Sequence, residues 1–107
     1  MLVIGISGSP RVNGNTNLLL DAVLEGSRSE NAEVKKFYLA NSVHSGCLGC
    51  GRCDTAGSCY IKDDISEIYD CIKEADALVL ASPIYFENIS SWMKTFVDRG
   101  QFLWSKN

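Results

Sequence analysis

Four cysteines stand close together in the middle of the chain, within residues 47–59, a segment that we call the cysteine loop. They are spaced C-x2-C-x2-C-x5-C, among three glycines and a single long apolar side chain, Leu48. Such a stretch cannot build a core, but it can wrap around a bound group and direct several thiolates at it. Four thiolates are what an iron–sulfur cluster or a structural zinc ion requires. The candidate metal ligands are Cys47, Cys50, Cys53 and Cys59.

The spacing of these cysteines favours an iron–sulfur cluster, with zinc as the main alternative. Ferredoxin-type clusters use C-x2-C-x2-C-x3-C-P; the first two spacings agree, whereas the last is longer and no proline follows Cys59. Structural zinc more often uses two separated cysteine pairs. A metal-free thiol relay and a disulfide pair remain as further interpretations. The fifth cysteine, Cys71, falls in an expected helix, and we interpret it as a small core residue.

A second segment, residues 7–17, joins an apolar run to the expected start of a helix. It offers free backbone N–H groups, hydroxyls, side-chain amides and the guanidinium of Arg11. These groups suit a terminal phosphate at a helix N-terminus. The glycine pattern fits neither a dinucleotide turn nor a Walker loop, so a mononucleotide is favoured. The alternative is an ordinary polar connection, although most such connections have only about 2–6 residues.

A third segment, residues 82–88, follows another apolar run and carries Pro83, Tyr85 and Phe86. A flavin ring needs a flat apolar wall and a few backbone polar groups, and this segment can provide both. The alternative is that the two aromatic rings only cover the end of a sheet.

Alternating patterns predict three strands and three helices. Residues 2–7 and 77–82 read as parallel strands buried on both faces, and the more polar residues 33–39 as an edge strand. Helices are expected at 16–29, with Leu18, Leu19 and Val23 on the apolar face, at 64–75, capped by Asp64, and from Ser90 or Ser91 onward.

This order of elements predicts an α/β fold with a doubly wound parallel sheet. Ligands of such sheets bind beyond the carboxyl ends of the strands, where the segments 7–17 and 82–88 would meet. Catalytic constellations of the Ser/His/Asp or paired-carboxylate type do not occur in the sequence. We therefore assign no catalytic residue and expect bound cofactors to supply the chemistry.

Composition excludes several classes of function. The chain has 107 residues, 46% of them apolar, and a net charge of −3, which predicts one globular domain. Its ten basic residues are scattered, so nucleic acid is not an expected partner. Its apolar start meets glycine, serine and proline too soon to be expected as a signal peptide, and no apolar run approaches the roughly 18 residues needed for a membrane span. We therefore expect a cytoplasmic location and no membrane partner.

Three motifs together resemble one family. They are Gly8-Ser9-Pro10-Arg11 with Asn15-Thr16, the cysteine loop followed by Lys62-Asp63-Asp64, and Ser82-Pro83-Ile84-Tyr85 with Lys94-Thr95-Phe96-Val97-Asp98-Arg99. Nearly the whole chain resembles the N-terminal part of the iron–sulfur flavoproteins, within the NADPH-dependent FMN reductase branch of flavodoxin-like proteins. Only the cysteine loop points to the cluster-bearing group.

The resemblance implies two cofactors, FMN and a [4Fe–4S] cluster, the latter on the four loop cysteines. FMN would have its phosphate at Ser9, Arg11, Asn15, Thr16 and Asn17, and its ring along Pro83, Ile84, Tyr85 and Phe86. The resemblance also implies a homo-oligomer, with ferredoxin or NAD(P)H as electron donor. The implied acceptor is a small molecule, a quinone or an oxygen species.

Length is where the chain departs from the family. A complete flavodoxin-like sheet has the order 2-1-3-4-5, and this sequence accounts only for strands in the order 2-1-3. We expect residues 1–107 to form a single, truncated flavodoxin-like domain lacking strands 4 and 5, with residues 47–59 inserted between the second strand and the second helix. Either the chain is a fragment, or a second chain covers the open edge.

Three functional hypotheses follow from the sequence. The first is an electron-transfer flavoprotein, an oxidoreductase that uses FMN and a [4Fe–4S] cluster to reduce a small acceptor. The second is an NAD(P)H-dependent FMN or quinone reductase without a cluster. The third is a non-enzymatic, zinc-binding fragment.

Overall fold

The centre of the protein is a sheet of three parallel strands. The computed structural model describes residues 1–42 and 44–105. In it, β1 (Leu2–Ser7) lies between β2 (Glu33–Tyr38) and β3 (Ala77–Ala81), so the strand order is 2-1-3 as expected. Within this register, Ile4 of β1 is opposite Lys35 of β2 and Leu78 of β3.

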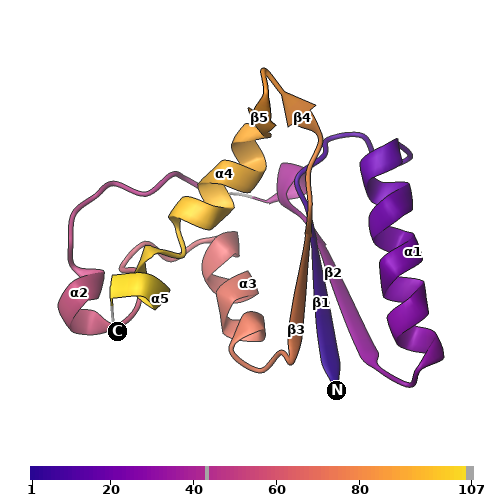
Figure 1. Ribbon diagram of the computed structural model, residues 1–107. Coiled ribbons are helices and arrows are strands. Elements are labelled where there is room, and N and C mark those ends of the chain that lie inside the picture. The colour runs from indigo at the N-terminus through magenta and orange to yellow at the C-terminus, as the bar shows by residue number, and fades with distance from the viewer. Residues whose placement is uncertain (43, 106–107) are drawn as a thin grey trace.

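Helices cover both faces of this sheet, as a doubly wound fold requires. Helix α1 (Asn15–Ser29) lies on one face, while α3 (Asp64–Ile72) and α4 (Ser91–Asp98) lie on the other (Figure 1). The short helix α5 (Gln101–Ser105) follows α4 and lies near α2 (Cys53–Ala56) of the cysteine loop. No helix within these described ranges has the length and apolar character needed to cross a membrane.

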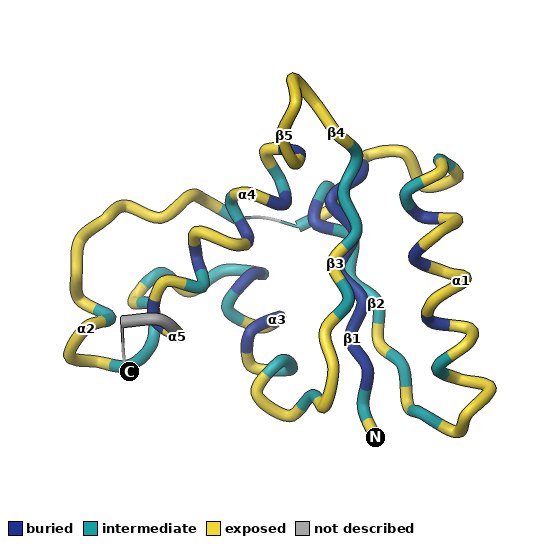
Figure 2. Tube along the Cα trace, in the orientation of Figure 1, coloured by how far each residue is buried: buried dark blue, intermediate teal, exposed yellow. Residues whose placement is uncertain are grey.

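Strand β1 contributes side chains to two hydrophobic cores, because successive side chains of a strand point to opposite faces of the sheet. Ile4 and Ile6 pack with buried residues of α3 and α4, whereas Val3 packs with Leu20 and Leu24 of α1. Gly5 faces α1 as well: a Cβ added there would lie 2.8 Å from Leu24 Cδ1. The absence of a side chain at Gly5 thus lets α1 approach the sheet closely. Figure 2 shows that buried positions lie along β1 itself.

Two packing expectations were wrong. The face of α1 that meets the sheet carries Leu20 and Leu24, whereas the expected Leu18, Leu19 and Val23 are exposed. These apolar side chains surround much of the helix, so spacing alone did not fix which face is buried.

Strand β3, expected to be buried on both faces, is partly exposed, with Leu78 at 41% and Leu80 at 46%. It is an edge strand of the described sheet, so a covering neighbour is lacking there.

Several short elements between β2 and α4 were not expected from the sequence. A 3-10 turn, η1 (Leu39–Asn41), follows β2 and buries Leu39. The strands β4 (Ile84–Tyr85) and β5 (Asn88–Ile89) form a small antiparallel hairpin. Both residues of its two-residue turn, Phe86 and Glu87, have positive φ angles of 48° and 64°. Positive φ at both central positions is typical of the type I′ turn that suits the twist of a hairpin.

Candidate functional site

The segment after β1 holds its own backbone in shape. The Ser7 hydroxyl oxygen accepts a hydrogen bond from the Ser9 N–H (3.3 Å), and the Ser9 hydroxyl oxygen accepts one from the Arg11 N–H (3.1 Å). The buried Asn17 amide donates to the Arg11 carbonyl (2.7 Å). The turn that carries Arg11 is therefore fixed from both sides before any ligand binds.

A cavity of about 220 Å³ opens where this segment meets the segment after β3. It is lined by Ser9, Arg11, Gly14, Asn15, Thr16, Pro83 and Tyr85. Gly14 is the N-cap of α1, and no side chain caps that helix. Backbone N–H groups at the start of α1, two hydroxyls and one guanidinium therefore point to an anion as the group that this cavity can hold.

Three of the residues expected at this site lie elsewhere. Asn17 is buried and contacts the loop from within, so its place is structural support. Ile84 and Phe86 are on the hairpin, and neither lines the cavity; their exposures are 76% and 101%. The hairpin turns these two side chains away from the cavity, whereas Tyr85, between them, lines it.

Ser90, expected from the sequence only as a possible helix start, connects the segments 7–17 and 82–88 by hydrogen bonds. Its hydroxyl donates to the Gly8 carbonyl (2.6 Å) and accepts from the Met93 N–H (3.2 Å), while its own N–H donates to the Ser82 hydroxyl (2.9 Å). Space is tight at this point, since a Cβ on Gly8 would lie 2.8 Å from the Ser90 hydroxyl oxygen. In the sequence, the available signals of this contact are the small residue Gly8 near the start of the segment 7–17 and the serine N-cap Ser90 after the hairpin.

A groove of about 440 Å³ runs beside the first cavity, between α1 and β3. Its walls include the exposed apolar side chains of Leu19, Val23 and Leu80, and Asn15 and Thr16 line both the groove and the first cavity. The site is thus continuous with an uncovered apolar surface.

The cysteine loop lies at the end of the molecule away from α1 (Figure 1). Its residues line a second cavity, of about 300 Å³. All four candidate ligands line it, and none of them is part of a disulfide. Cys47 and Cys50 are exposed, whereas Cys53 and Cys59 are half-buried. In the part of the chain that is described, groups of three or more metal-ligating side chains do not converge closely enough to hold a metal ion. The loop therefore places its sulfurs around one space without drawing them together.

Glycines let this loop turn around the cavity. Gly49, Gly51 and Gly57 have φ angles of 66°, 77° and 77°, a left-handed conformation that other residues rarely adopt. Gly57 also ends α2 as its C-cap. The backbone path around the cysteines thus depends on glycine at these three positions.

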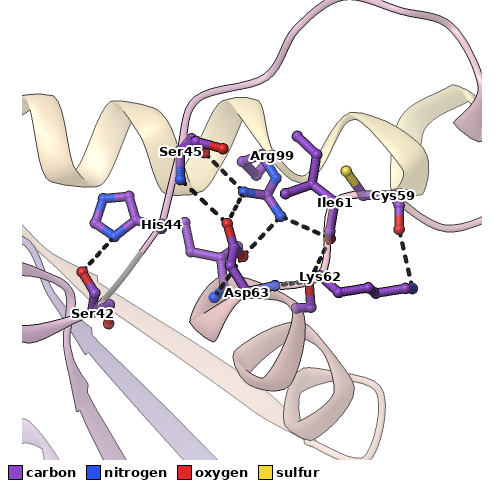
Figure 3. A network of polar contacts seen from close by, with 10 residues as sticks. Ser42, His44, Ser45, Cys59, Ile61, Lys62, Asp63 and Arg99 are labelled. Carbon is purple, nitrogen blue, oxygen red and sulfur yellow. Dashed lines mark hydrogen bonds and ion pairs between the residues drawn. The ribbon is translucent and has the colours of Figure 1, made fainter.

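One buried guanidinium joins the two ends of the cysteine loop. Arg99 Nη1 donates to the Ser45 carbonyl (2.8 Å), before the loop, and Nη2 donates to the Ile61 carbonyl (3.3 Å), after it (Figure 3). Both nitrogens also contact the Asp63 carboxylate, at 2.7 and 3.0 Å. We call this arrangement of Ser45, Ile61, Asp63 and Arg99 the arginine brace. It closes the loop at its base.

Asp63 has a second role as the N-cap of α3, one residue before the expected Asp64. Its carboxylate accepts from the Ile65 N–H (3.1 Å), and Ser66 completes a capping box. Burial would raise the pKa of Asp63, but its hydrogen bonds and charge interaction with Arg99 outweigh this and lower it. Burial would likewise lower the pKa of Arg99, yet Asp63 and, to a smaller extent, Cys59 raise it. Both groups are therefore charged at neutral pH.

The sequence alone predicts no role for Arg99. The signal available was an arginine directly after the apolar face of α4, which carries the buried Met93 and Phe96. A charged residue at such a position needs a buried partner, and Asp63 is 36 residues away in sequence. That pairing could not be read from local spacing.

Comparisons with known proteins agree on one family. Over residues 1–107 the chain matches the family described as NADPH-dependent FMN reductase. It is 41% identical over 99 residues to an iron–sulfur flavoprotein from Archaeoglobus fulgidus, covering 92% of this chain and 45% of that protein. An iron–sulfur flavoprotein from Methanocaldococcus jannaschii is 44% identical over 101 residues, with coverages of 94% and 52%. The resemblance inferred from the motifs is thereby confirmed.

A solved structure extends the likeness to three dimensions. A flavone reductase superposes with a TM-score of 0.72 at 26% identity, covering 94% of this chain and 30% of that one. The flavodoxin-like fold class is thus confirmed. The chain spans about half the length of the curated relatives it matches.

Proposed function

The chain belongs to the NADPH-dependent FMN reductase family, and from this premise we propose that it is the part of a flavin oxidoreductase that holds the FMN phosphate and a four-cysteine iron–sulfur cluster. The observation that carries the proposal is the cavity formed jointly by the segments after β1 and β3, with Arg11, two hydroxyls and an uncapped helix N-terminus on its walls. These groups match the charge and the hydrogen-bonding needs of a phosphate.

In this proposal each residue at the phosphate site has a distinct role. Arg11 supplies positive charge, while the hydroxyls of Ser9 and Thr16, the Asn15 amide and backbone N–H groups supply hydrogen bonds. The Ser9 oxygen already accepts from the Arg11 N–H, so its hydroxyl proton is free to face a ligand oxygen. Asn17 acts behind the site by holding the Arg11 carbonyl. In this proposal Pro83 and Tyr85 flank the ring, and Ile84 and Phe86 extend that apolar surface from the hairpin.

The cysteine loop fits an iron–sulfur cluster by its donor chemistry. None of the four candidate ligands is in a disulfide, all four line one cavity, and glycines allow the loop to tighten around a bound group. Thiolate ligands must lose their protons on binding, so loading depends on pH. Several relatives, from Archaeoglobus fulgidus and Methanocaldococcus jannaschii among others, are iron–sulfur flavoproteins, which supports this choice of group.

When bound, FMN supplies two-electron chemistry and the [4Fe–4S] cluster supplies one-electron transfer. The chain's own residues bind and orient these groups, and Tyr85 and Pro83 shield one cavity wall from water. We propose NAD(P)H or ferredoxin as electron donor and a quinone or an oxygen species as small acceptor. Assembly as a homo-oligomer is part of the same proposal.

Selective binding of FMN over riboflavin tests the phosphate site. We expect the protein to bind FMN more tightly than riboflavin, and Arg11→Gln to reduce that preference by about 10- to 100-fold, the loss of one charge-assisted interaction of about 1.5–3 kcal/mol. Arg28→Gln is the matched control, since Arg28 is an exposed arginine at the far end of α1. Flavin fluorescence titration measures both constants. Equal affinity for the two flavins in the unaltered protein would contradict the proposal.

A second candidate function is a flavin reductase in which the cysteines bind nothing. It is favoured by a 27% identical relative from Bacillus subtilis, a putative NAD(P)H-dependent FMN-containing oxidoreductase. This candidate expects flavin reduction by NAD(P)H to survive Cys50→Ser unchanged. The matched control is Cys71→Ser, because Cys71 lies outside the loop.

A further inference from the structure

Arg99 has one donor that the arginine brace does not use. A guanidinium carries five N–H donors, two on each Nη and one on Nε. The four Nη hydrogens meet Ser45, Ile61 and the two oxygens of Asp63. Among the described residues, Nε has no hydrogen-bond partner, although it is buried. A buried donor left unpaired costs about 1–3 kcal/mol, so this atom calls for an explanation.

Cys59 is a neighbour of Arg99 whose sulfur can accept a hydrogen bond from this donor. Both residues line the 300 Å³ cavity of the cysteine loop, and both line a smaller cavity of about 70 Å³ behind it. Figure 3 shows the Cys59 sulfur on the same side of the guanidinium as the segment that carries Ile61. Lys62 Nζ donates to the Cys59 carbonyl (3.2 Å) and so holds this part of the chain in place. Only 1% of the Arg99 side chain is exposed, so water does not compete for its free donor.

We propose that Arg99 is a positioning residue for the cluster, its Nε–H donating to the Cys59 sulfur when that sulfur is a ligand and thereby raising the reduction potential of the cluster. This inference rests on the proposed function, since it concerns the same four-cysteine site. A ligating sulfur carries negative charge, and reduction adds more. A hydrogen bond and a buried positive charge beside it favour the reduced state, and such outer contacts tune iron–sulfur potentials.

The brace explains why this donor is well placed for that task. The guanidinium is held by four other hydrogen bonds, two of them to main-chain carbonyls at opposite ends of the loop. Its orientation is therefore set by the fold and does not depend on the cluster. Because a guanidinium is a planar fork, a lysine ammonium cannot keep all these contacts.

The direct test uses the unaltered chain. Protein labelled with ¹⁵N-arginine is loaded with iron and sulfide, reduced with dithionite and examined by electron–nuclear double resonance. We expect a ¹⁵N coupling to the cluster that persists in Arg52→Lys, which removes the one arginine within the cysteine loop, an exposed residue stacked over Tyr60. A loaded cluster without ¹⁵N coupling would overturn the inference, and so would a coupling that disappears in Arg52→Lys.

Two variants add a measurement that a purely structural brace would not move. Arg99→Lys keeps the charge but loses Nε–H, and Arg99→Gln loses both. We expect both loaded variants to have a more negative midpoint potential than the unaltered protein, with the larger shift in Arg99→Gln and none in Arg52→Lys. Loaded variants with an unchanged potential would mean that Arg99 acts on the fold alone.

The outcomes separate this inference from the proposed function. If the unaltered protein binds no iron and sulfide, the proposed function fails first. If it loads but shows neither the coupling nor the shift in potential, only the role of Arg99 is wrong. Should Arg99→Gln not fold, Arg99→Lys and the spectrum of the unaltered protein still decide the matter.

Discussion

Asp63 and Arg99 give the protein a predictable response to acid. The pKa of Asp63 is lowered in the folded state, so its contribution to stability is present above the unfolded value of about 3.9 and is lost as pH falls through the folded pKa. We expect Asp63→Asn to lower the free energy of unfolding by about 3–5 kcal/mol at pH 7, because it leaves Arg99 buried and unpaired. That deficit should shrink below pH 4. Urea denaturation at pH 7 and pH 3 measures it.

The control for this prediction is Glu25→Gln, which removes an exposed partner of Arg28. Exposed ion pairs contribute about 0–1 kcal/mol, so this variant should differ little from the unaltered protein at either pH. A deficit in Asp63→Asn that is the same at both pH values would show that the ion pair is not its source.

Residue types predicted many of the residues that line the two cavities, but not the contacts that support them. Cysteine spacing and a polar segment before a helix identified residues that line the two cavities. Arg99 and Ser90 were missed because their partners are 36 and 82 residues away. Long-range pairs of this kind have no local periodicity. Ile84 and Phe86 do not line the first cavity, because they belong to a hairpin whose positive-φ turn, Phe86 and Glu87, apolar spacing does not reveal.

Among the elements, Gly8 is where the start of the segment 7–17 meets the start of α4. An added Cβ would lie 2.9 Å from Met93 Cβ and 2.8 Å from the Ser90 hydroxyl oxygen, and neither atom is at the far end of a flexible side chain. We expect Gly8→Ala to lower the free energy of unfolding by about 1–3 kcal/mol through overpacking. Urea denaturation is the measurement.

Gly26→Ala is the matched control for Gly8→Ala. Gly26 lies within α1, and an added Cβ there has no atom within 4 Å. Alanine is the better helix former by about 0.5–1 kcal/mol, so this variant should be slightly more stable. If Gly8→Ala were as stable as Gly26→Ala, the close contact between the two segments would not be what positions the site.

The elements themselves were largely predictable from sequence. Their order and type followed from apolar periodicity, and the parallel 2-1-3 sheet followed from that order. Which face of α1 is buried was not predictable, because Leu18, Leu19 and Leu20 are all apolar. Only the position of the sheet decides which of them is covered. The exposure of β3 likewise depends on what lies beside it.

At the scale of the whole molecule, the uncovered edge of β3 sets the main physical constraint. Leu78 and Leu80 are exposed beside a groove of about 440 Å³, and a strand edge with apolar side chains is a template for another strand. We expect the 107-residue chain to self-associate in sedimentation velocity. Leu80→Lys should shift it toward the monomer.

Leu18→Lys is the control for that experiment, because Leu18 is equally apolar and 61% exposed but does not line the groove. It should leave the sedimentation behaviour unchanged. Equal effects of the two substitutions would point to general solubility instead of pairing at the β3 edge.

The decisive test of the proposed function is the content of iron, acid-labile sulfide, zinc and flavin in protein purified or reconstituted without oxygen. The proposed function predicts FMN together with iron and sulfide in the equal amounts of a [4Fe–4S] cluster. It also predicts loss of iron and sulfide in Cys50→Ser and their retention in Cys71→Ser. Zinc without sulfide, or iron and sulfide that survive Cys50→Ser undiminished, would contradict it.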